Sequence, residues 1–190
     1  MKMKTNIVNS IKFYLGYIRC KRNHIAHQKH VYIGKSANIV GGVSIRLSPY
    51  VIIRPYVDIW ATGGFIKIGE GTEIGERCRI SISNELIIGN HVLFSPNVYI
   101  TDCDHEYKHV GIPIIKQGIV HKDNRVEIGD GSYIGINSVI VGNVKIGAGS
   151  VIGANSVVTK DIPDCCIAVG VPARVIKRFN SHSQQWERVE

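Results

Sequence analysis

An aliphatic residue returns every six positions along most of this chain. From Ile33 the steps reach Ile39, Ile45, Val51 and Val57. The register resumes in three later runs: Ile68, Ile74 and Ile80; then Ile88, Phe94 and Ile100; then Ile128, Ile134, Ile140, Ile146, Ile152 and Val158. All seventeen positions are Ile, Val or Phe. Six residues are too few for a helical repeat unit, and they fit a short strand followed by a turn.

Two neighbouring positions follow the same period. The residue after the aliphatic one is often glycine: Gly34, Gly69, Gly75, Gly89, Gly129, Gly135, Gly147 and Gly153. The residue two before it is small or favours strands, as in Thr72, Ser132 and Ser150. Simple two-residue alternation would not produce such fixed offsets. We therefore expect an all-β fold, a parallel β-helix in which three units form a triangular coil and stacked coils lie about 4.8 Å apart.

The physical role of each position follows from this geometry. The aliphatic side chain points into the prism and stacks on its copies in adjacent coils, and the small residue fits the crowded inner corner. We expect the glycine to ease a tight corner where positive φ is needed. The seventeen units predict roughly six coils.

The pattern divides the chain into three regions. We expect an N-terminal helical cap over residues 1–30, a β-helix over 31–163 with an inserted loop at about 102–126, and a C-terminal tail over 164–190. The tail is expected to hold a short helix after Pro172, formed around Val175, Ile176 and Phe179, with Trp186 beside it.

The basic residues are concentrated at the N-terminus. The net charge is +8, yet residues 1–57 hold ten Lys and Arg and no acid, because Asp58 is the first acidic residue. Within this region, residues 5–18 place apolar side chains on one helical face: Ile7, Val8, Ile11, Tyr14, Leu15 and Ile18. This helix either caps the open end of the β-helix or docks on an anionic membrane surface. No basic and aromatic pattern of a known nucleic-acid-binding module is present, so no nucleic acid partner is expected.

Composition excludes several other classes of protein. Apolar residues make up 44% of the chain and charged residues 20%, which argues against a disordered chain and against several membrane spans. The five cysteines are odd in number and show no CxxC spacing, so a reducing compartment fits better than a disulfide framework. The apolar segment from Ile7 to Ile18 is too short to span a bilayer and makes a poor signal peptide. We expect a cytoplasmic protein, with peripheral contact at the membrane face as the alternative.

The six-residue register breaks between Ile100 and Ile128, and a long segment that leaves a solenoid is usually functional. His105 follows the strand-like NVYITD closely, so the regular coils can hold it in place. His91, His109 and His121 are weaker candidates. A neutral imidazole can accept the proton of an attacking hydroxyl, which is typically worth about 10² to 10⁴ in rate.

Neighbours of His105 leave three alternatives open. Asp102 and Asp104 flank it, and one of them orients the imidazole or holds an acceptor, or else both are solvated loop acids. Cys103 allows a covalent mechanism with His105 as the activating base. Asp102, His105 and His109 allow a metal site. The zinc carbonic anhydrases, whose fold the repeat resembles, take histidine ligands from neighbouring coils, and such ligands are not seen inside the repeat here, so the resemblance implies no metal.

The repeat resembles the hexapeptide-repeat acyltransferases, which form a left-handed parallel β-helix. NVYITDCDH, from Asn97 to His105, is similar to the segment that ends on the catalytic histidine in the galactoside, maltose and surface-polysaccharide acetyltransferases. The resemblance implies His105 as general base, with Asp102 and Asn97 in support or in acceptor binding. It also implies a homotrimer with active sites between the prisms.

A second resemblance lies near the C-terminus. VIGANSVVTKDIP and the following GVPARVI are similar to the coenzyme A end of these enzymes. This implies a pantetheine path near Ile136 and Ala154 and a nucleotide end near Thr159 and Lys160. It also implies phosphate contacts from Arg174 and Lys177.

The resemblance implies an acetyl-CoA-dependent transfer. The tail QWER, Gln185 to Arg188, resembles O-antigen O-acetyltransferases, so the expected acceptor is a sugar hydroxyl of a lipopolysaccharide or capsule precursor. The alternatives are an antibiotic acetyltransferase, a nucleotide-sugar N-acetyltransferase and a non-catalytic β-helix scaffold.

Overall fold

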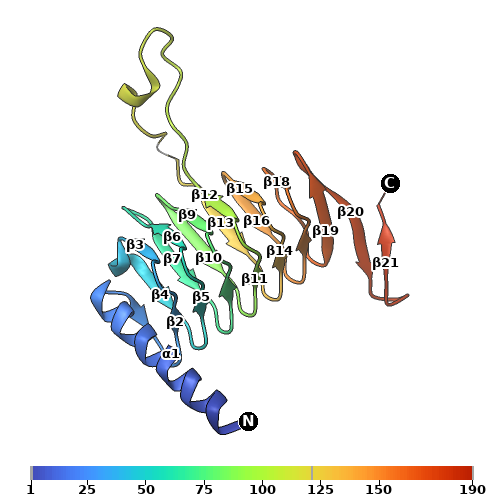
Figure 1. Cartoon of the computed structure of the whole chain (residues 1–190). Coiled ribbons are helices and arrows are strands. Elements are labelled where there is room, and N and C mark those ends of the chain that lie inside the picture. Colours follow the sequence, from blue (N-terminus) through green and yellow to red (C-terminus); the bar gives the residue numbers. More distant parts are fainter. Residues whose placement is uncertain (1, 121, 190) are drawn as a thin grey trace.

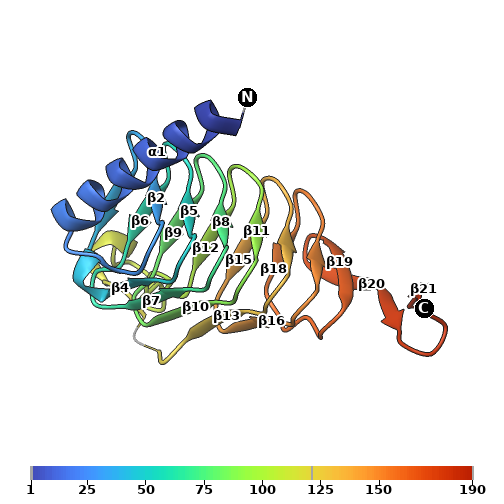
Figure 2. The ribbon, with the colours of Figure 1, turned by 90° about the horizontal axis from the view of Figure 1, so that it is seen from below.

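The fold is a three-sided stack of coils with a helix at one end and an antiparallel hairpin at the other (Figure 1). It is seen in a computed structural model that describes residues 2–120 and 122–189, with side chains described from residue 10 onward. Helix α1 (Lys2–Arg22) lies across the N-terminal end of the stack (Figure 2). A long arm leaves one edge of the stack between β12 (Tyr99–Thr101) and β13 (Arg125–Ile128) (Figure 1).

Each face of the prism is a sheet of parallel strands. The first face holds β1 (Ala26–His27), β4 (Ile45–Leu47), β7 (Phe65–Ile68), β10 (Glu85–Ile88), β13 (Arg125–Ile128) and β16 (Val144–Ile146). The second holds β2 (Tyr32–Ile33), β5 (Ile52–Ile53), β8 (Glu73–Ile74), β11 (Leu93–Phe94), β14 (Tyr133–Ile134), β17 (Val151–Ile152) and β19 (Cys166–Gly170). The third holds β3 (Asn38–Val40), β6 (Asp58–Trp60), β9 (Arg79–Ser81), β12 (Tyr99–Thr101), β15 (Val139–Val141) and β18 (Val157–Val158).

The core is a set of aliphatic columns that run along the stack. On the second face Ile33 pairs with Ile53, Phe94 with Ile134, and Ile134 with Ile152, and all of these side chains are buried. Small polar residues at the inner corners also link the coils, since the Ser132 hydroxyl donates to the Gly147 carbonyl at 2.9 Å. The predicted all-β parallel architecture is confirmed.

The predicted register is wrong in the second coil. Leu47, Ile53 and Ile59 pair with Ile68, Ile74 and Ile80, so they hold the aliphatic positions there instead of Ile45, Val51 and Val57. The replaced residues are also buried, but they lie two positions earlier in the coil. The cause is an extended corner at η1 (Gly42–Ser44), which lengthens the step from Ile39 to Leu47 to eight residues.

The glycine that follows the aliphatic residue serves a different purpose from the one expected. Gly69 and Gly75 do not have positive φ; the left-handed residues are those two positions later, such as Gly71 and Arg77. A Cβ added at Gly69 would lie 2.4 Å from the carbonyl carbon of Gly89, and one at Gly75 would lie 2.4 Å from the Ser95 oxygen. Glycine is required there because adjacent coils approach too closely for any side chain.

Departures from the six-residue step gather at one edge of the prism. We name the corner between the third and first faces the arm edge; it comprises residues 41–44, 61–64, 82–84, 102–124, 142–143 and 159–161. The corner between the second and third faces, named the asparagine edge, comprises residues 34–37, 54–57, 75–78, 95–98, 135–138 and 153–156 and keeps a constant length. The insert is therefore the longest of several extensions at the same edge.

The N-terminal helix is present, and it contacts the first coil through a face other than the apolar face identified from the sequence. Gly16 and Cys20 are buried against the first coil, whereas Ile11, Tyr14, Leu15 and Ile18 are exposed. The side chains of Ile7 and Val8 lie outside the described residues. None of the helices in the described part of the chain combines the length and apolar character needed to cross a bilayer.

The prediction of a short C-terminal helix is wrong, because this region forms two strands. β20 (Ala173–Asn180) pairs antiparallel with β19, and β21 (Gln185–Arg188) pairs with β20. The β-branched Val175 and Ile176 favour a strand, and the free edge of β19 supplies backbone groups that a strand can bond and a helix cannot. Trp186 does contact Phe179, with ring centroids 5.5 Å apart.

Candidate active site

The arm continues directly from β12, and its two legs are bonded to each other at the base. The Glu106 N–H donates to the Gly118 carbonyl at 3.0 Å, and the Val120 N–H donates to the Asp104 carbonyl at 2.9 Å. His105 lies between these bonds and forms an isolated antiparallel bridge with Ile119. Its backbone is therefore held on both sides, close to the rigid coils.

The His105 side chain is exposed on the arm. Among the described residues, none donates or accepts a hydrogen bond at its ring. A pocket of about 180 Å³ lies at the base of the arm, lined in part by Asp102, Cys103 and Asn124, and His105 does not line it. Within a single chain the imidazole thus faces open space.

Asp102 anchors the base of the arm to the coil before it. Its carboxylate is fully buried and accepts the backbone N–H groups of Ser83 at 2.8 Å, Asn84 at 2.7 Å and Glu85 at 3.0 Å. Its own carbonyl accepts the Asn124 amide at 2.8 Å, which ties the returning leg of the arm to the outgoing one. The three N–H donors satisfy a buried charge that would otherwise be costly.

The same bonding recurs at this edge in later coils. The Asn143 side chain accepts the Arg125 N–H at 2.9 Å, and the Asp161 side chain accepts the Lys145 N–H at 2.8 Å. A polar acceptor at this corner thus holds the start of a first-face strand in the preceding coil. The hydrogen bonds of Asp102 show that it positions the base of the arm. Its direct action on the His105 ring or on an acceptor stays a prediction.

The remaining polar residues of the insert are not gathered around His105. The Cys103 sulfur lies 3.3 Å from the Thr101 hydroxyl, and the Asp104 carboxylate accepts the backbone N–H of His105 at 2.8 Å. The backbone of His109 is bonded to the Gln117 side chain farther along the arm. Within residues 2–120 and 122–189, no group of three His, Cys, Asp or Glu side chains could hold a metal ion. His121 lies outside the described residues.

Three predicted residues line the asparagine edge in consecutive coils. Asn97, Ile136 and Ala154 are all exposed. They lie in adjoining corners, since the Asn137 N–H donates to the Pro96 carbonyl at 3.3 Å and the Asn155 N–H donates to the Ile136 carbonyl at 2.9 Å. Asn97 has a φ of 60°, a conformation that asparagine tolerates better than most residues. The strand β12 separates Asn97 from Asp102, so Asn97 and His105 lie at different edges of one chain.

A β-bulge brings the two predicted phosphate ligands to one side of the C-terminal hairpin. Arg174 and Lys177 are three residues apart in β20, and residues at that spacing normally face opposite ways. The register shifts between Ile167 and Ala168, so that Arg174 pairs with Val169 and Lys177 with Ile167. Val169 and Ile167 are two residues apart, so their side chains lie on the same face of the sheet. Directly opposed residues also share a face, and Arg174 and Lys177 therefore lie on the same side of β20.

Thr159 and Lys160 lie at the arm edge, directly after β18, and both are exposed. This is the edge from which the arm leaves, two coils earlier, or about 10 Å along the stack. Apart from Arg174 and Lys177 in the C-terminal hairpin, the predicted site residues thus fall into two sets. Asp102, His105, Thr159 and Lys160 belong to the arm edge, whereas Asn97, Ile136 and Ala154 belong to the asparagine edge.

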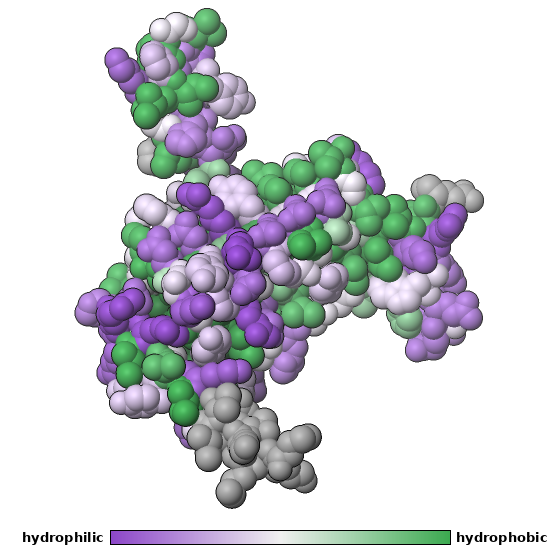
Figure 3. All heavy atoms as spheres, in the orientation of Figure 1, coloured by the Kyte–Doolittle hydropathy of each residue, from purple (hydrophilic) through white to green (hydrophobic). Residues whose placement is uncertain are grey.

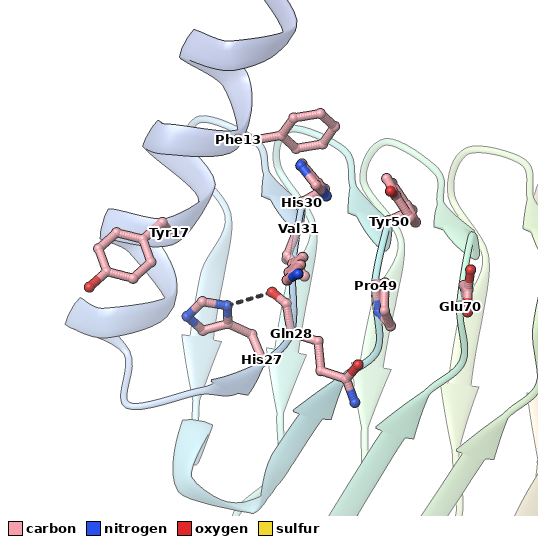
Figure 4. A pocket seen from close by; sticks show the side chains of 10 residues that line it. Phe13, Tyr17, His27, Gln28, His30, Val31, Pro49, Tyr50 and Glu70 are labelled. Atoms are coloured by element: carbon pink, nitrogen blue, oxygen red, sulfur yellow. Dashed lines mark hydrogen bonds between the residues drawn. The ribbon is translucent and has the colours of Figure 1, made fainter.

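A separate hollow of about 670 Å³ lies beneath α1 at the corner between the first and second faces. Figure 4 shows Phe13 and Tyr17 reaching from the helix toward His30 and His27. None of the predicted site residues lines this hollow.

Comparison with known proteins agrees with the repeat. Residues 125–160 match the bacterial transferase hexapeptide family, described by six repeats. The chain is 30% identical over 156 residues to WbbJ of Escherichia coli, a protein named for O-acetyl transfer in lipopolysaccharide biosynthesis, and the match covers 80% of this chain and 74% of that protein. The chain belongs to the hexapeptide-repeat acetyltransferases. The family expected from the sequence motifs is thereby confirmed.

Other relatives differ in length from this chain. A protein of Mycobacterium tuberculosis named as an acetyltransferase is 32% identical over 167 residues, which cover 86% of this chain and 54% of the relative. The galactoside O-acetyltransferase of Escherichia coli is 36% identical over 124 residues, covering 65% of this chain and 59% of the enzyme. The chain therefore spans little more than half the length of these two relatives.

The fold also matches a solved structure. The N-acyltransferase AntD of Bacillus cereus, solved with dTDP and 3-hydroxybutyryl-CoA, superposes with a TM-score of 0.75 at 24% identity and covers 90% of this chain and 92% of its own. This likeness concerns the fold alone, and the expected left-handed β-helix is confirmed.

The repeat pattern does not predict two residues that hold the arm in position. Asn124 bonds the base of the arm, and the Gln117 amide donates to the carbonyls of His109 at 3.0 Å and Ile112 at 2.7 Å near the tip. Both lie where the six-residue period is interrupted, so no periodic signal marks them.

Replacing Asp102 with asparagine is expected to lower the free energy of unfolding by about 2–4 kcal/mol, because an amide NH₂ would face backbone donors that now share a carboxylate. Denaturant unfolding measures this change. The control is Asp104→Asn, an exposed carboxylate beside it, which should change stability by less than about 0.5 kcal/mol. Equal stability of the two variants would contradict the anchoring role.

Proposed function

We propose that this protein is an acetyl-CoA-dependent O-acetyltransferase that acts on a sugar hydroxyl of a lipopolysaccharide O-antigen or capsule precursor. The observation that carries the proposal is the placement of His105. Its backbone is held by the hydrogen bonds between the two legs of the arm, its ring is exposed, and it lies on the same edge as Thr159 and Lys160.

The proposed chemistry needs one base and one leaving group. The imidazole of His105 accepts the proton of the sugar hydroxyl as its oxygen attacks the thioester carbonyl carbon. A C–O bond forms, the C–S bond breaks, and the departing thiolate takes the proton from the imidazolium. The ring returns to its neutral form, so no redox partner or metal is required. A covalent step at Cys103 finds no support, since its sulfur contacts Thr101.

The residues predicted for coenzyme A suit its chemistry. Ile136 and Ala154 give an exposed, weakly polar strip along the asparagine edge, which fits a pantetheine chain. Arg174 and Lys177 add two cations on one side of β20, and Lys160 adds a third at the arm edge. Cations of this kind bind phosphate groups.

A homotrimer would join the two sets of residues. In a ring of three prisms related by rotation, the arm edge of one protomer faces another edge of its neighbour. His105 and Lys160 of one chain would then meet Ile136 and Ala154 of the next. The arm supports this arrangement, because apolar atoms are exposed along it in Figure 3. Ile115, which lies on the arm, is 88% exposed.

The acceptor is inferred from relatives. WbbJ and the galactoside O-acetyltransferases carry names that specify O-acetyl transfer, and the former specifies lipopolysaccharide. The specific alternative is an amine acceptor, as in AntD, whose structures include one with dTDP-4-amino-4,6-dideoxyglucose. We retain the cytoplasm as the proposed location, consistent with five cysteines that are all free.

Replacing His105 with alanine is expected to lower kcat with acetyl-CoA and a glycan acceptor by about 10² to 10⁴, because the base is lost. His109→Ala is the matched control from the same arm and should keep most activity. Thermal unfolding of both variants should be close to that of the parent chain, since both side chains are exposed. Undiminished turnover by His105→Ala would show that His105 is not the general base. Acetylation of amino sugars but not of sugar hydroxyls would show that the protein is an N-acetyltransferase.

Replacing Lys160 or Arg174 with alanine is expected to raise the Kd for coenzyme A about tenfold or more, because a charge-assisted bond to phosphate is removed. Isothermal titration calorimetry measures this, with Lys67→Ala on the first face as the control for a simple loss of charge. If all three variants bind coenzyme A like the parent chain, the predicted phosphate contacts are wrong. If the parent chain itself does not bind, the protein is a scaffold.

Replacing Ile115 with glutamate is expected to dissociate the trimer or to raise its dissociation constant by more than about tenfold, because a charge would be buried at the contact. Light scattering after size-exclusion chromatography gives the oligomeric state. Val189→Glu, an exposed apolar residue far from the arm in sequence, is the control and should stay trimeric. A parent chain that is monomeric at all concentrations would refute the shared site.

A further inference from the structure

Helix α1 is locked on the first coil by its inner face. A Cβ at Gly16 would lie 2.1 Å from the Val31 carbonyl oxygen, so the helix backbone touches the coil at this point. The Arg19 guanidinium donates to the Ile33 carbonyl. Figure 4 shows the Phe13 ring meeting His30 edge to face, with centroids 5.2 Å apart. These contacts fix which side of the helix turns away from the prism.

The side turned away carries an apolar stripe. Ile11, Tyr14, Leu15 and Ile18 follow the spacing i, i+3, i+4 and i+7, which places them on one helical face. Their exposed fractions are 55%, 65%, 40% and 43%. We name these four residues the outer stripe. In a water-soluble helix, this face would normally be polar.

Only positive charges accompany the outer stripe. Lys12, Lys21 and Arg22 are exposed on the same helix, and no acidic residue precedes Asp58. An apolar helix face flanked by cations matches the interface of an anionic bilayer, where acyl chains lie beneath negative headgroups. A second copy of the same helix would bring like charges together, which disfavours pairing of two outer stripes.

We infer that the outer stripe of α1 docks on an anionic phospholipid surface, with the helix lying in the plane of the interface. The rigid contact of α1 with the first coil then turns the N-terminal end of the prism toward the lipid (Figures 1 and 2). The arm and the C-terminal hairpin stand farther along the stack. The inference does not depend on the reaction that the protein catalyses.

Vesicle flotation with the full chain tests this docking. Vesicles of equal parts phosphatidylglycerol and phosphatidylcholine should carry the protein with them, whereas vesicles of pure phosphatidylcholine should bind it at least about tenfold more weakly. Raising the salt from about 0.1 M to about 1 M shortens the Debye length from about 10 Å to about 3 Å and should weaken binding to the anionic vesicles.

Two paired variants separate the apolar and the charged contributions. Ile11→Glu with Ile18→Glu and, separately, Lys12→Glu with Lys21→Glu should each weaken binding by at least about tenfold. The matched controls are Val189→Glu near the C-terminus and Lys67→Glu on the first face, and both should bind like the parent chain. All substituted positions are exposed, and circular dichroism and thermal unfolding would verify the fold.

Other results would contradict the docking of the outer stripe on anionic lipid. Equal binding by the outer-stripe variants and the parent chain would show that another surface meets the lipid. Loss of self-association in the Ile11→Glu and Ile18→Glu chain, with no vesicle binding by the parent, would assign the outer stripe to a second copy. Binding that is equal for neutral and anionic vesicles would exclude the proposed electrostatic part.

Discussion

The spacing between adjacent coils governs this structure. Parallel strands lie about 4.8 Å apart, so every coil must repeat its neighbour closely enough to bond it along all three faces. Aliphatic columns such as Ile134 on Ile152 fill the interior at that spacing. The same spacing requires glycine at Gly69 and Gly75, because any side chain there would collide with the next coil. Inner hydroxyls, such as that of Ser132, then bond carbonyl groups that the strands leave free.

One edge escapes this constraint and carries the arm that holds His105, the proposed base. Residues at the arm edge lie between faces, so extra chain there leaves the stack without breaking a ladder. The asparagine edge keeps its length, whereas the arm edge accepts two additional residues at η1 and more than twenty at the arm. An inserted segment is useful only if its base is held, and the buried Asp102 carboxylate holds it to three backbone N–H groups. His105 gains a fixed backbone from that arrangement while its ring stays accessible.

The sequence predicts what depends on periodicity and misses what depends on pairing. Seventeen aliphatic positions suffice for the fold, because a period of six fits few architectures. The predicted register is wrong at Val51 and Val57 because Ile53 and Ile59, two positions later, are also buried and aliphatic. The period alone does not show which residue of each pair holds the repeat position. The C-terminal strand was missed because β20 is stabilised by the edge of β19, a partner that local pattern does not reveal. The bonds of Asp102 join residues seventeen to nineteen positions apart, outside any motif.

The two exposed apolar surfaces differ in charge, and this difference separates their proposed partners. Residues 102–124 hold four acidic residues and three lysines, and Glu106 pairs with Lys108 within the arm. A nearly neutral apolar arm can enter a protein interface without leaving unpaired charge behind. The outer stripe of α1 instead lies in a region of ten cations and no acid, which another copy of the chain would repel. Apolar exposure alone would favour the same kind of contact for both surfaces. The charge around each favours a neighbouring protomer as the partner of the arm and an anionic lipid surface as the partner of the helix.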